Sequence, residues 1–129
     1  MKECVTKGRC HLYIEDVEKF RAILSEIDNE DTLSSITKVF KALSDPTRIQ
    51  ILYLLQKGDL CVCEMESILE KPQSTLSHHL SILKNTDLIK PRKEGIWIYY
   101  TLLKPDIVKF IDFFNPKDTL EKINVLNEV

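Results

Sequence analysis

Apolar side chains change their spacing abruptly at Leu88, and this change restricts the fold more than any other feature of the chain. In the segment 73–85, leucines recur at i, i+4 and i+7, which places them on one face of a helix. In the segment 96–101, side chains alternate with a period of two, and Glu94-Gly95 supplies a turn just before them. The sequence therefore predicts a helix that is followed directly by a β-hairpin.

A second short helix is expected just ahead of the leucine helix. Met65, Ile68 and Leu69 can form its inner face within the segment 59–69, and a break follows at 70–72. Two short helices joined by a tight turn indicate a helix-turn-helix motif. With the hairpin behind it, the expected fold is a mainly α winged helix-turn-helix with a small β-hairpin wing.

Helical spacing also predicts three helices before this motif. Apolar residues between 17 and 27 and between 33 and 43 define the first two, and a polar break at 29–31 separates them. The third follows Asp45-Pro46, which supplies an N-cap and a proline at the first helical position, and Gly58 ends it as a C-cap.

A further helix is expected after the hairpin, over 105–114. It is apolar nearly all round, and on so small a domain this indicates a subunit interface. Pro116 ends it, and apolar residues in 120–126 predict a weak final helix.

Composition favours one compact domain in the cytoplasm. With 129 residues, 43% of them hydrophobic, the chain can bury a core without disulfide bonds. No apolar run is long enough to span a bilayer, and the N-terminus lacks the apolar stretch of a secretory signal, so no membrane partner is expected. In a reducing cytosol the four cysteines are expected to be thiols with metal or redox chemistry.

Charge places any nucleic-acid contact in the middle of the chain. The formal net charge of -2 argues against indiscriminate binding to polyanions. Between Lys71 and Thr101, however, five Lys and Arg residues face only Asp87 and Glu94, whereas the segment up to Asp31 is acidic. If DNA is bound, this middle segment binds it.

The outward face of helix 73–85 carries short donors and acceptors that can approach base edges, although an ordinary solvated face is the alternative. His79 lies beside the leucine stripe and is expected to be partly buried against the backbone. Two cations near the hairpin turn can bind the sugar-phosphate backbone of DNA. The alternative is that they only keep a charged turn soluble. The aromatic residues of 97–100 are expected in the core of the sheet. The candidate DNA contacts are Gln73, Ser74, Thr75, Ser77, His78, Arg92 and Lys93.

Cys61 and Cys63 form the most informative short motif. Residues two apart point to nearly opposite sides of a helix but share one side of an extended segment. For both thiolates to hold one ion, Cys61 must lie before the helix proper, or the first turn must deform. A helix N-terminus lowers a thiol pKa and so favours the thiolate that metals require, whereas a disulfide between these two residues would be strained.

Two thiolates make an incomplete soft-metal site, which Cys4 and Cys10 can complete with up to four sulfur ligands. Tetrahedral sulfur suits cadmium or zinc, while three sulfurs in a pyramid suit lead, bismuth or arsenite. His11 can substitute a nitrogen ligand. The alternative is that these cysteines are small buried apolar residues or incidental surface thiols.

Nothing in the sequence indicates an enzyme. It shows no glycine-rich phosphate loop and no prominent acidic pair, and its Cys and His residues single out no nucleophile with a base.

Four segments together resemble the ArsR/SmtB family of metal-sensing repressors: 40–52, 59–65, 74–80 and 92–95, within a match over roughly 32–114. The resemblance implies a homodimeric winged helix that represses a metal efflux or detoxification operon and leaves double-stranded operator DNA when metal binds. It implies that Cys61 and Cys63 are ligands and that Gln73, Ser74, Thr75, Ser77 and His78 occupy the DNA-reading positions. Cys4 and Cys10 resemble the cadmium/lead-sensing branch, in which N-terminal cysteines of the partner subunit complete the site.

The resemblance also implies a domain organisation and an inducer. Residues 1–31 form an arm and a short helix with metal-ligand cysteines, 32–116 form the DNA-binding and dimerisation domain, and 117–129 form a tail. Cadmium, lead, zinc, arsenite or antimonite acts as inducer, and DNA binding requires no cofactor. Two alternatives remain open: an oxidant-sensing repressor of the same fold, and a metal-binding interaction module without an operator.

Overall fold

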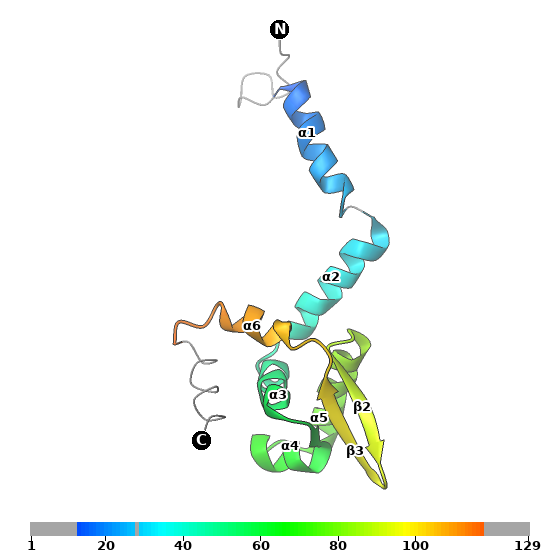
Figure 1. Cartoon of the computed structure of the whole chain (residues 1–129), viewed down its shortest axis with the longest axis vertical. Helices are drawn as coiled ribbons and strands as arrows, with labels where there is room; N and C mark the ends of the chain where they lie inside the picture. Colours follow the sequence, from blue (N-terminus) through cyan, green and yellow to red (C-terminus); the bar gives the residue numbers. More distant parts are fainter. Residues whose placement is uncertain (1–12, 28, 118–129) are drawn as a thin grey trace. The chain divides into compact units, whose positions relative to one another are not determined.

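The structure, a computed structural model, describes residues 13–27 and 29–117 (Figure 1). These residues form two units that divide between Lys38 and Val39. The cysteines at 4 and 10, His11 and the expected helix over 120–126 lie outside the described residues. No helix in the two described ranges combines the length and the apolar character that a membrane span requires.

The first unit contains α1 (Ile14–Ser25) and most of α2 (Glu30–Leu43). Both expected helices are confirmed, but the break between them lies before Glu30 and not at the expected 29–31, because α1 ends at Ser25 and Asn29 caps α2. Its side-chain Oδ1 accepts the backbone N–H of Thr32 at 2.8 Å. The acidic residues that follow Asn29 therefore form the first turn of α2, where negative charge is favourable.

The second unit holds the winged helix-turn-helix. After the last turn of α2 come α3 (Pro46–Lys57), β1 (Leu60–Cys61), α4 (Val62–Leu69), α5 (Gln73–Asn85), β2 (Ile89–Glu94), β3 (Trp97–Leu102) and α6 (Asp106–Asp112). Glu70 ends α4 in the left-handed conformation, and its N–H bonds to the Glu66 carbonyl at 2.9 Å. The bounds of α5 and the break before it confirm the expected helix-turn-helix.

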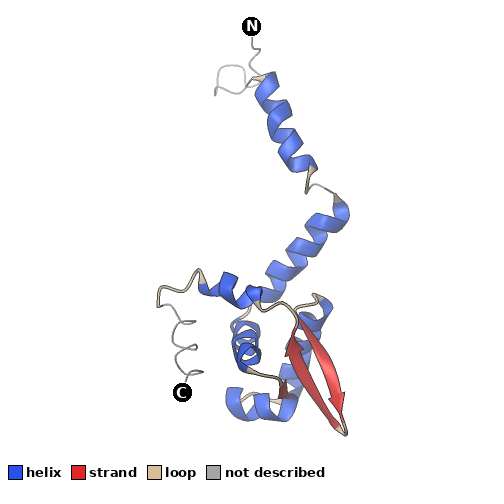
Figure 2. Cartoon of the chain, in the orientation of Figure 1, coloured by secondary structure: helices blue, strands red, loops and turns tan. Residues whose placement is uncertain are grey.

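A three-stranded antiparallel sheet in the order β1-β3-β2 forms the wing and joins it to α4 (Figure 2). The two-residue strand β1 was not expected, because so short a segment has no periodicity to detect. The hairpin turn was predicted one residue too early. Glu94 pairs with Trp97, so the turn residues are Gly95 and Ile96, and Gly95 has a φ of 63°, which glycine adopts without strain.

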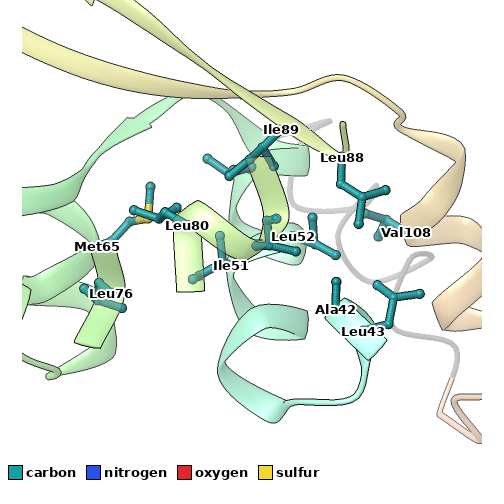
Figure 3. Packing of buried hydrophobic residues seen from close by; sticks show 12 residues of the cluster. Ala42, Leu43, Ile51, Leu52, Met65, Leu76, Leu80, Leu88, Ile89 and Val108 are labelled. Carbon is teal, nitrogen blue, oxygen red and sulfur yellow. The ribbon is translucent and has the colours of Figure 1, made fainter. Parts of the chain in front are cut away.

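The leucine stripe of α5 forms the centre of the core. Leu76, Leu80 and Leu83 are at most 1% exposed and belong to one cluster with residues from α2, α3, α4, β2 and α6 (Figure 3). The aromatic residues of 97–100 were expected in the core of the sheet, but Trp97 is 51% exposed because it lies at the far end of the hairpin. Tyr100, nearer the helices, packs against the core cluster.

α6 ends at Asp112, two residues before the expected end of that helix. Its apolar residues divide between the core and solvent. Val108 is fully buried, whereas Phe110, Phe113 and Phe114 are 41%, 80% and 68% exposed. The rings of these three phenylalanines form a chain of edge-to-face contacts that continues to Phe40 on α2. An apolar surface of this kind is typical of a subunit interface.

Asp45 starts α3 as the sequence predicts, and its removal gives a first testable result. Its Oδ1 accepts the N–H groups of Thr47 and Arg48 at 2.8 and 3.2 Å. Asp45→Ala is expected to lower the free energy of unfolding by about 1 kcal/mol in urea denaturation at neutral pH, while Asp45→Asn keeps most of it. Equal losses in the two variants would show that capping is not the cause.

The cap also has a pH dependence. Burial raises the pKa of the Asp45 carboxyl, but the N–H groups of Arg48 and Thr47 and the nearby His79 ring outweigh burial and leave the pKa lowered. A lowered native pKa stabilises the fold fully above the carboxyl's ordinary value of 3.8, and this stabilisation is lost as the pH falls through the native pKa.

Candidate nucleic-acid interface and metal centre

α5 presents the side chains that the sequence predicts for DNA contact. Its leucines point into the core, and Gln73, Ser74, Thr75, Ser77 and His78 are exposed. Pro72 occupies the N-cap position and no side chain within 13–27 or 29–117 caps the first turn, so among these residues the backbone N–H groups at this end of α5 remain available to an anion. An exposed row of short polar groups with a free N-terminus has the form of a recognition helix.

His79 is a structural residue, in agreement with its expected partial burial. Its Nδ1 lies 3.4 Å from Arg48 Nη1 and 3.9 Å from Asp45 Oδ1, and its side chain is 13% exposed. Burial lowers the pKa of the His79 ring, although the nearby Asp45 carboxylate acts in the opposite direction. Both contacts are to the N-terminal end of α3, so His79 joins α5 to α3 through side chains, where a backbone partner was expected.

The two candidate cations of the wing differ in their surroundings. Arg92 Nη1 lies 2.7 Å from Glu94 Oε2, and Arg92 Nη2 lies 3.2 Å from Asp59 Oδ2. Lys93 is exposed and forms no ion pair with another described residue. Sequence reasoning missed Asp59 as a partner of the wing, because the two residues of this pair are 33 positions apart.

The cysteine pair lies where β1 meets α4. Cys61 is the N-cap of α4 and has extended backbone angles, so it precedes the helix proper, as a shared site requires. Its N–H donates to Glu64 Oε1 at 3.1 Å, which fixes the start of the helix. The two Sγ atoms of Cys61 and Cys63 are 2.8 Å apart and not bonded to each other; Cys61 is buried and Cys63 exposed.

The pKa of the Cys61 thiol differs from the expectation for a helix N-terminus. Burial raises this pKa, the neighbouring Cys63 thiol and the Glu64 carboxylate add to the rise, and the value reaches about 11. These effects exceed any lowering by the helix, so the free thiol is protonated at neutral pH. A metal ion that binds it must displace a proton.

A hollow of about 330 Å³ connects the cysteines with both candidate DNA-binding elements. Cys61, Cys63 and Glu66 line one side, Gln73 at the start of α5 lines another, and residues 96–98 at the wing tip complete it. No sequence pattern indicates this arrangement, because it depends on the pairing of β1 with β3. An ion bound at the two sulfurs would therefore lie beside the start of α5 and the wing tip.

Cys61 and Cys63 are the described part of the candidate metal centre. Among residues 13–27 and 29–117 no group of three or more His, Cys, Asp or Glu side chains is placed to hold a metal ion. The other two candidate ligands, Cys4 and Cys10, fall outside these ranges.

Comparison with known proteins identifies the family. The sequence model described as "Bacterial regulatory protein, arsR family" matches residues 45–90, from the N-cap of α3 to the start of β2. The chain is 40% identical over 99 residues to the "Cadmium resistance transcriptional regulatory protein CadC homolog" of Staphylococcus aureus, a match that covers 76% of this chain and 81% of that protein. This chain belongs to the arsR family of bacterial regulatory proteins.

Other arsR-family comparisons agree. The "Arsenical resistance operon repressor" of Bacillus subtilis is 44% identical over 73 residues, which cover 56% of this chain and 70% of that protein. The solution structure of a homodimeric winged helix-turn-helix DNA-binding domain from Mycobacterium bovis matches with a TM-score of 0.57 and 27% identity, covering 74% of this chain and 82% of that one. The winged helix-turn-helix fold is confirmed, and so is the prediction of a transcriptional regulator that is not an enzyme.

Proposed function

We propose that this arsR-family regulator represses transcription as a homodimer on double-stranded operator DNA and dissociates when Cys61 and Cys63 capture a soft metal ion. The observation that carries the proposal is the hollow that the two cysteines share with Gln73 and the wing tip. Relatives named for cadmium and arsenical resistance support soft metals or metalloids as inducers.

The proposed DNA contacts follow from exposure. α5 enters the major groove and its N-terminal N–H groups bind phosphates of the DNA backbone. The side chains that face base edges and phosphates are Gln73, Ser74, Thr75, Ser77 and His78. Arg92 and Lys93 on the wing reach neighbouring phosphates, a contact that needs only charge and reach.

The proposed dimer uses α6 and the adjacent end of α2. Phe40, Phe110, Phe113 and Phe114 present exposed, mutually contacting rings, and a second copy of the chain would bury them. The similar solution structure from Mycobacterium bovis is homodimeric, which supports this assignment.

The sulfur pair fits a soft metal ion. Two sulfurs on one tetrahedral zinc ion, each about 2.3 Å from it, lie about 3.8 Å apart. The Sγ atoms of Cys61 and Cys63, at 2.8 Å, are closer than this, so the side chain of exposed Cys63 would have to turn outward by about 1 Å for both sulfurs to bind one ion. Cys4 and Cys10 are proposed to supply the remaining sulfurs, from the partner subunit. Four sulfurs would favour cadmium or zinc, and three would favour lead, arsenite or antimonite.

Capture is proposed to act through α4. The N-terminal arm is drawn onto Cys61 and Cys63, α4 tilts about its N-terminus, and the recognition helices of the dimer lose their joint register on DNA. A coupling free energy of about 1–3 kcal/mol corresponds to a roughly 5- to 150-fold loss of affinity. The direct test is a binding titration on a duplex that the protein selects from a random pool, with and without cadmium. Unchanged affinity would contradict regulation by metal, and failure to select any duplex would contradict operator binding.

The alternative function is an oxidant sensor, in which a disulfide and not a metal ion releases DNA, and a thiol titration distinguishes the two. Thiol titration after mild peroxide is expected to show no disulfide, and the cadmium response is expected to persist in the treated sample. A disulfide between an N-terminal cysteine and Cys61 or Cys63, with DNA release, would favour an oxidant sensor.

Trp97 should report metal capture directly. It is the one tryptophan in the chain and lines the hollow with both cysteines. Cadmium is expected to change its fluorescence emission and to saturate at the stoichiometry of the site, because the guest and the ordered arm alter the surroundings of the indole. A Cys61→Ser, Cys63→Ser double variant should show no change. The same response in that variant would place the metal elsewhere.

A further inference from the structure

Arg92, the larger of the two wing cations, is held by carboxylates of its own chain. Its two terminal guanidinium nitrogens point to different partners, Glu94 at 2.7 Å and Asp59 at 3.2 Å. Glu94 is a neighbour in the same strand, whereas Asp59 belongs to the connection between α3 and β1. A guanidinium binds phosphate through the same N–H groups, so the carboxylates occupy the groups that DNA needs.

The sheet places Arg92 of this ion pair on the same face as Cys61. Cys61 pairs with Tyr99 across β1 and β3, and Tyr99 pairs with Arg92 across β3 and β2. Directly opposed residues of an antiparallel pair point to the same face, and Arg92 Cζ indeed lies 5.1 Å from the centroid of the Tyr99 ring. Asp59 also accepts the Thr101 hydroxyl at 2.8 Å, which fixes its carboxylate beside the guanidinium.

We propose that Asp59 competes with DNA phosphate for Arg92, so that the unbound protein keeps this cation in an internal ion pair and releases it when the wing contacts DNA. The inference rests on the proposed function, because it assumes that the wing binds the backbone. Asp59 thereby lowers the affinity of the protein for any DNA duplex. It does so by holding the Arg92 side chain and does not contact DNA itself.

Arg92 can leave Asp59 for a DNA phosphate at a small cost in free energy, because both side chains are partly exposed. The side chains of Arg92 and Asp59 are 44% and 34% exposed, and ion pairs at such positions are weak and screened by salt. Asp59 is also two residues before Cys61, next to the N-terminus about which α4 is proposed to tilt.

The test compares single and double variants on one duplex that the wild-type protein selects from a random pool, over a series of salt concentrations. Asp59→Asn is expected to tighten binding on the order of two- to fivefold. Arg92→Gln should weaken binding and reduce the salt slope by about one. In the Arg92→Gln background, Asp59→Asn should have no effect. In the parent, Asp59→Glu keeps the carboxylate and should leave the affinity for DNA at the wild-type value.

Lys93→Gln is the matched control, since Lys93 is a neighbouring exposed cation without an ion pair among the described residues. In its background, Asp59→Asn should tighten binding by the same factor as in the parent. Equal tightening with and without Arg92 would mean that Asp59 only repels DNA, and weaker binding by Asp59→Asn would mean that the pair braces the wing. Either result overturns the inference while operator binding stands. If the wild-type protein selects no duplex, the proposed function fails instead.

Discussion

Replacing Cys61 and Cys63 together with serine is expected to abolish the release of DNA by cadmium. In the wild-type protein, we expect the metal to weaken operator binding by roughly 5- to 150-fold. In the double variant the ratio of affinities with and without cadmium should be close to one, because a hydroxyl is a poor ligand for a soft ion. Metal-free affinity should be retained, since neither sulfur is among the proposed DNA contacts. Fluorescence anisotropy of the labelled duplex measures both values.

Two further variants separate metal binding from folding. Cys61 is 5% exposed, so its substitution also disturbs packing, whereas Cys63 is exposed and Cys63→Ser should remove one ligand with little effect on stability. Ser67→Ala, one turn further along the exposed part of α4, leaves both sulfurs in place and should respond to cadmium like the wild type. A full cadmium response in Cys63→Ser would exclude the proposed ligand pair.

Leu80→Ala is expected to lower the free energy of unfolding more than any other single substitution proposed for this protein. Leu80 is 1% exposed at the centre of the cluster that joins α5 to the rest of the winged helix, and its truncation leaves a cavity (Figure 3). Substitutions of this kind cost about 2–5 kcal/mol, a large fraction of the roughly 5–15 kcal/mol that stabilises a typical domain. Urea denaturation should therefore show a strongly lowered midpoint, and DNA binding should fall with the folded fraction.

The adjacent Ser81 provides the control. It is exposed on the opposite side of α5, so Ser81→Ala should change stability by less than about 0.5 kcal/mol. If Leu80→Ala proved as stable as Ser81→Ala, the leucine stripe would not be the inner face of α5, and the assignment of its outer face to DNA would lose its basis.

Elements with a repeated pattern were predictable from the sequence, and single pairings were not. The bounds of α5 follow from three leucines on one face and a proline just before the helix, and those of α3 follow from Asp45-Pro46 and Gly58. β1 has only two residues and exists because β3 offers it partners. Its position decides that Cys61 is extended, so the part of the fold that creates the cysteine site left no periodic signal.

The electrostatics of the site depended on burial and on side-chain contacts that no sequence pattern shows. The thiol pKa of Cys61 was expected to fall near a helix N-terminus, but burial together with Cys63 and Glu64 raises it. The charge of Arg92 was visible in the sequence, whereas its pairing with Asp59 depends on the β1-β3-β2 order. Cys4 and Cys10 remain predicted ligands from the sequence alone.

If sulfur-metal bonds at positions 61 and 63 cause operator release, metal binding and DNA release must coincide in one titration. Cadmium is added to the protein bound to a labelled duplex while thiolate-to-metal absorption and DNA anisotropy are recorded in the same sample. We expect both signals to change together and to reach their end points at the same metal equivalents. Release of DNA without the absorption band, or a complete band with the DNA still bound, would contradict it.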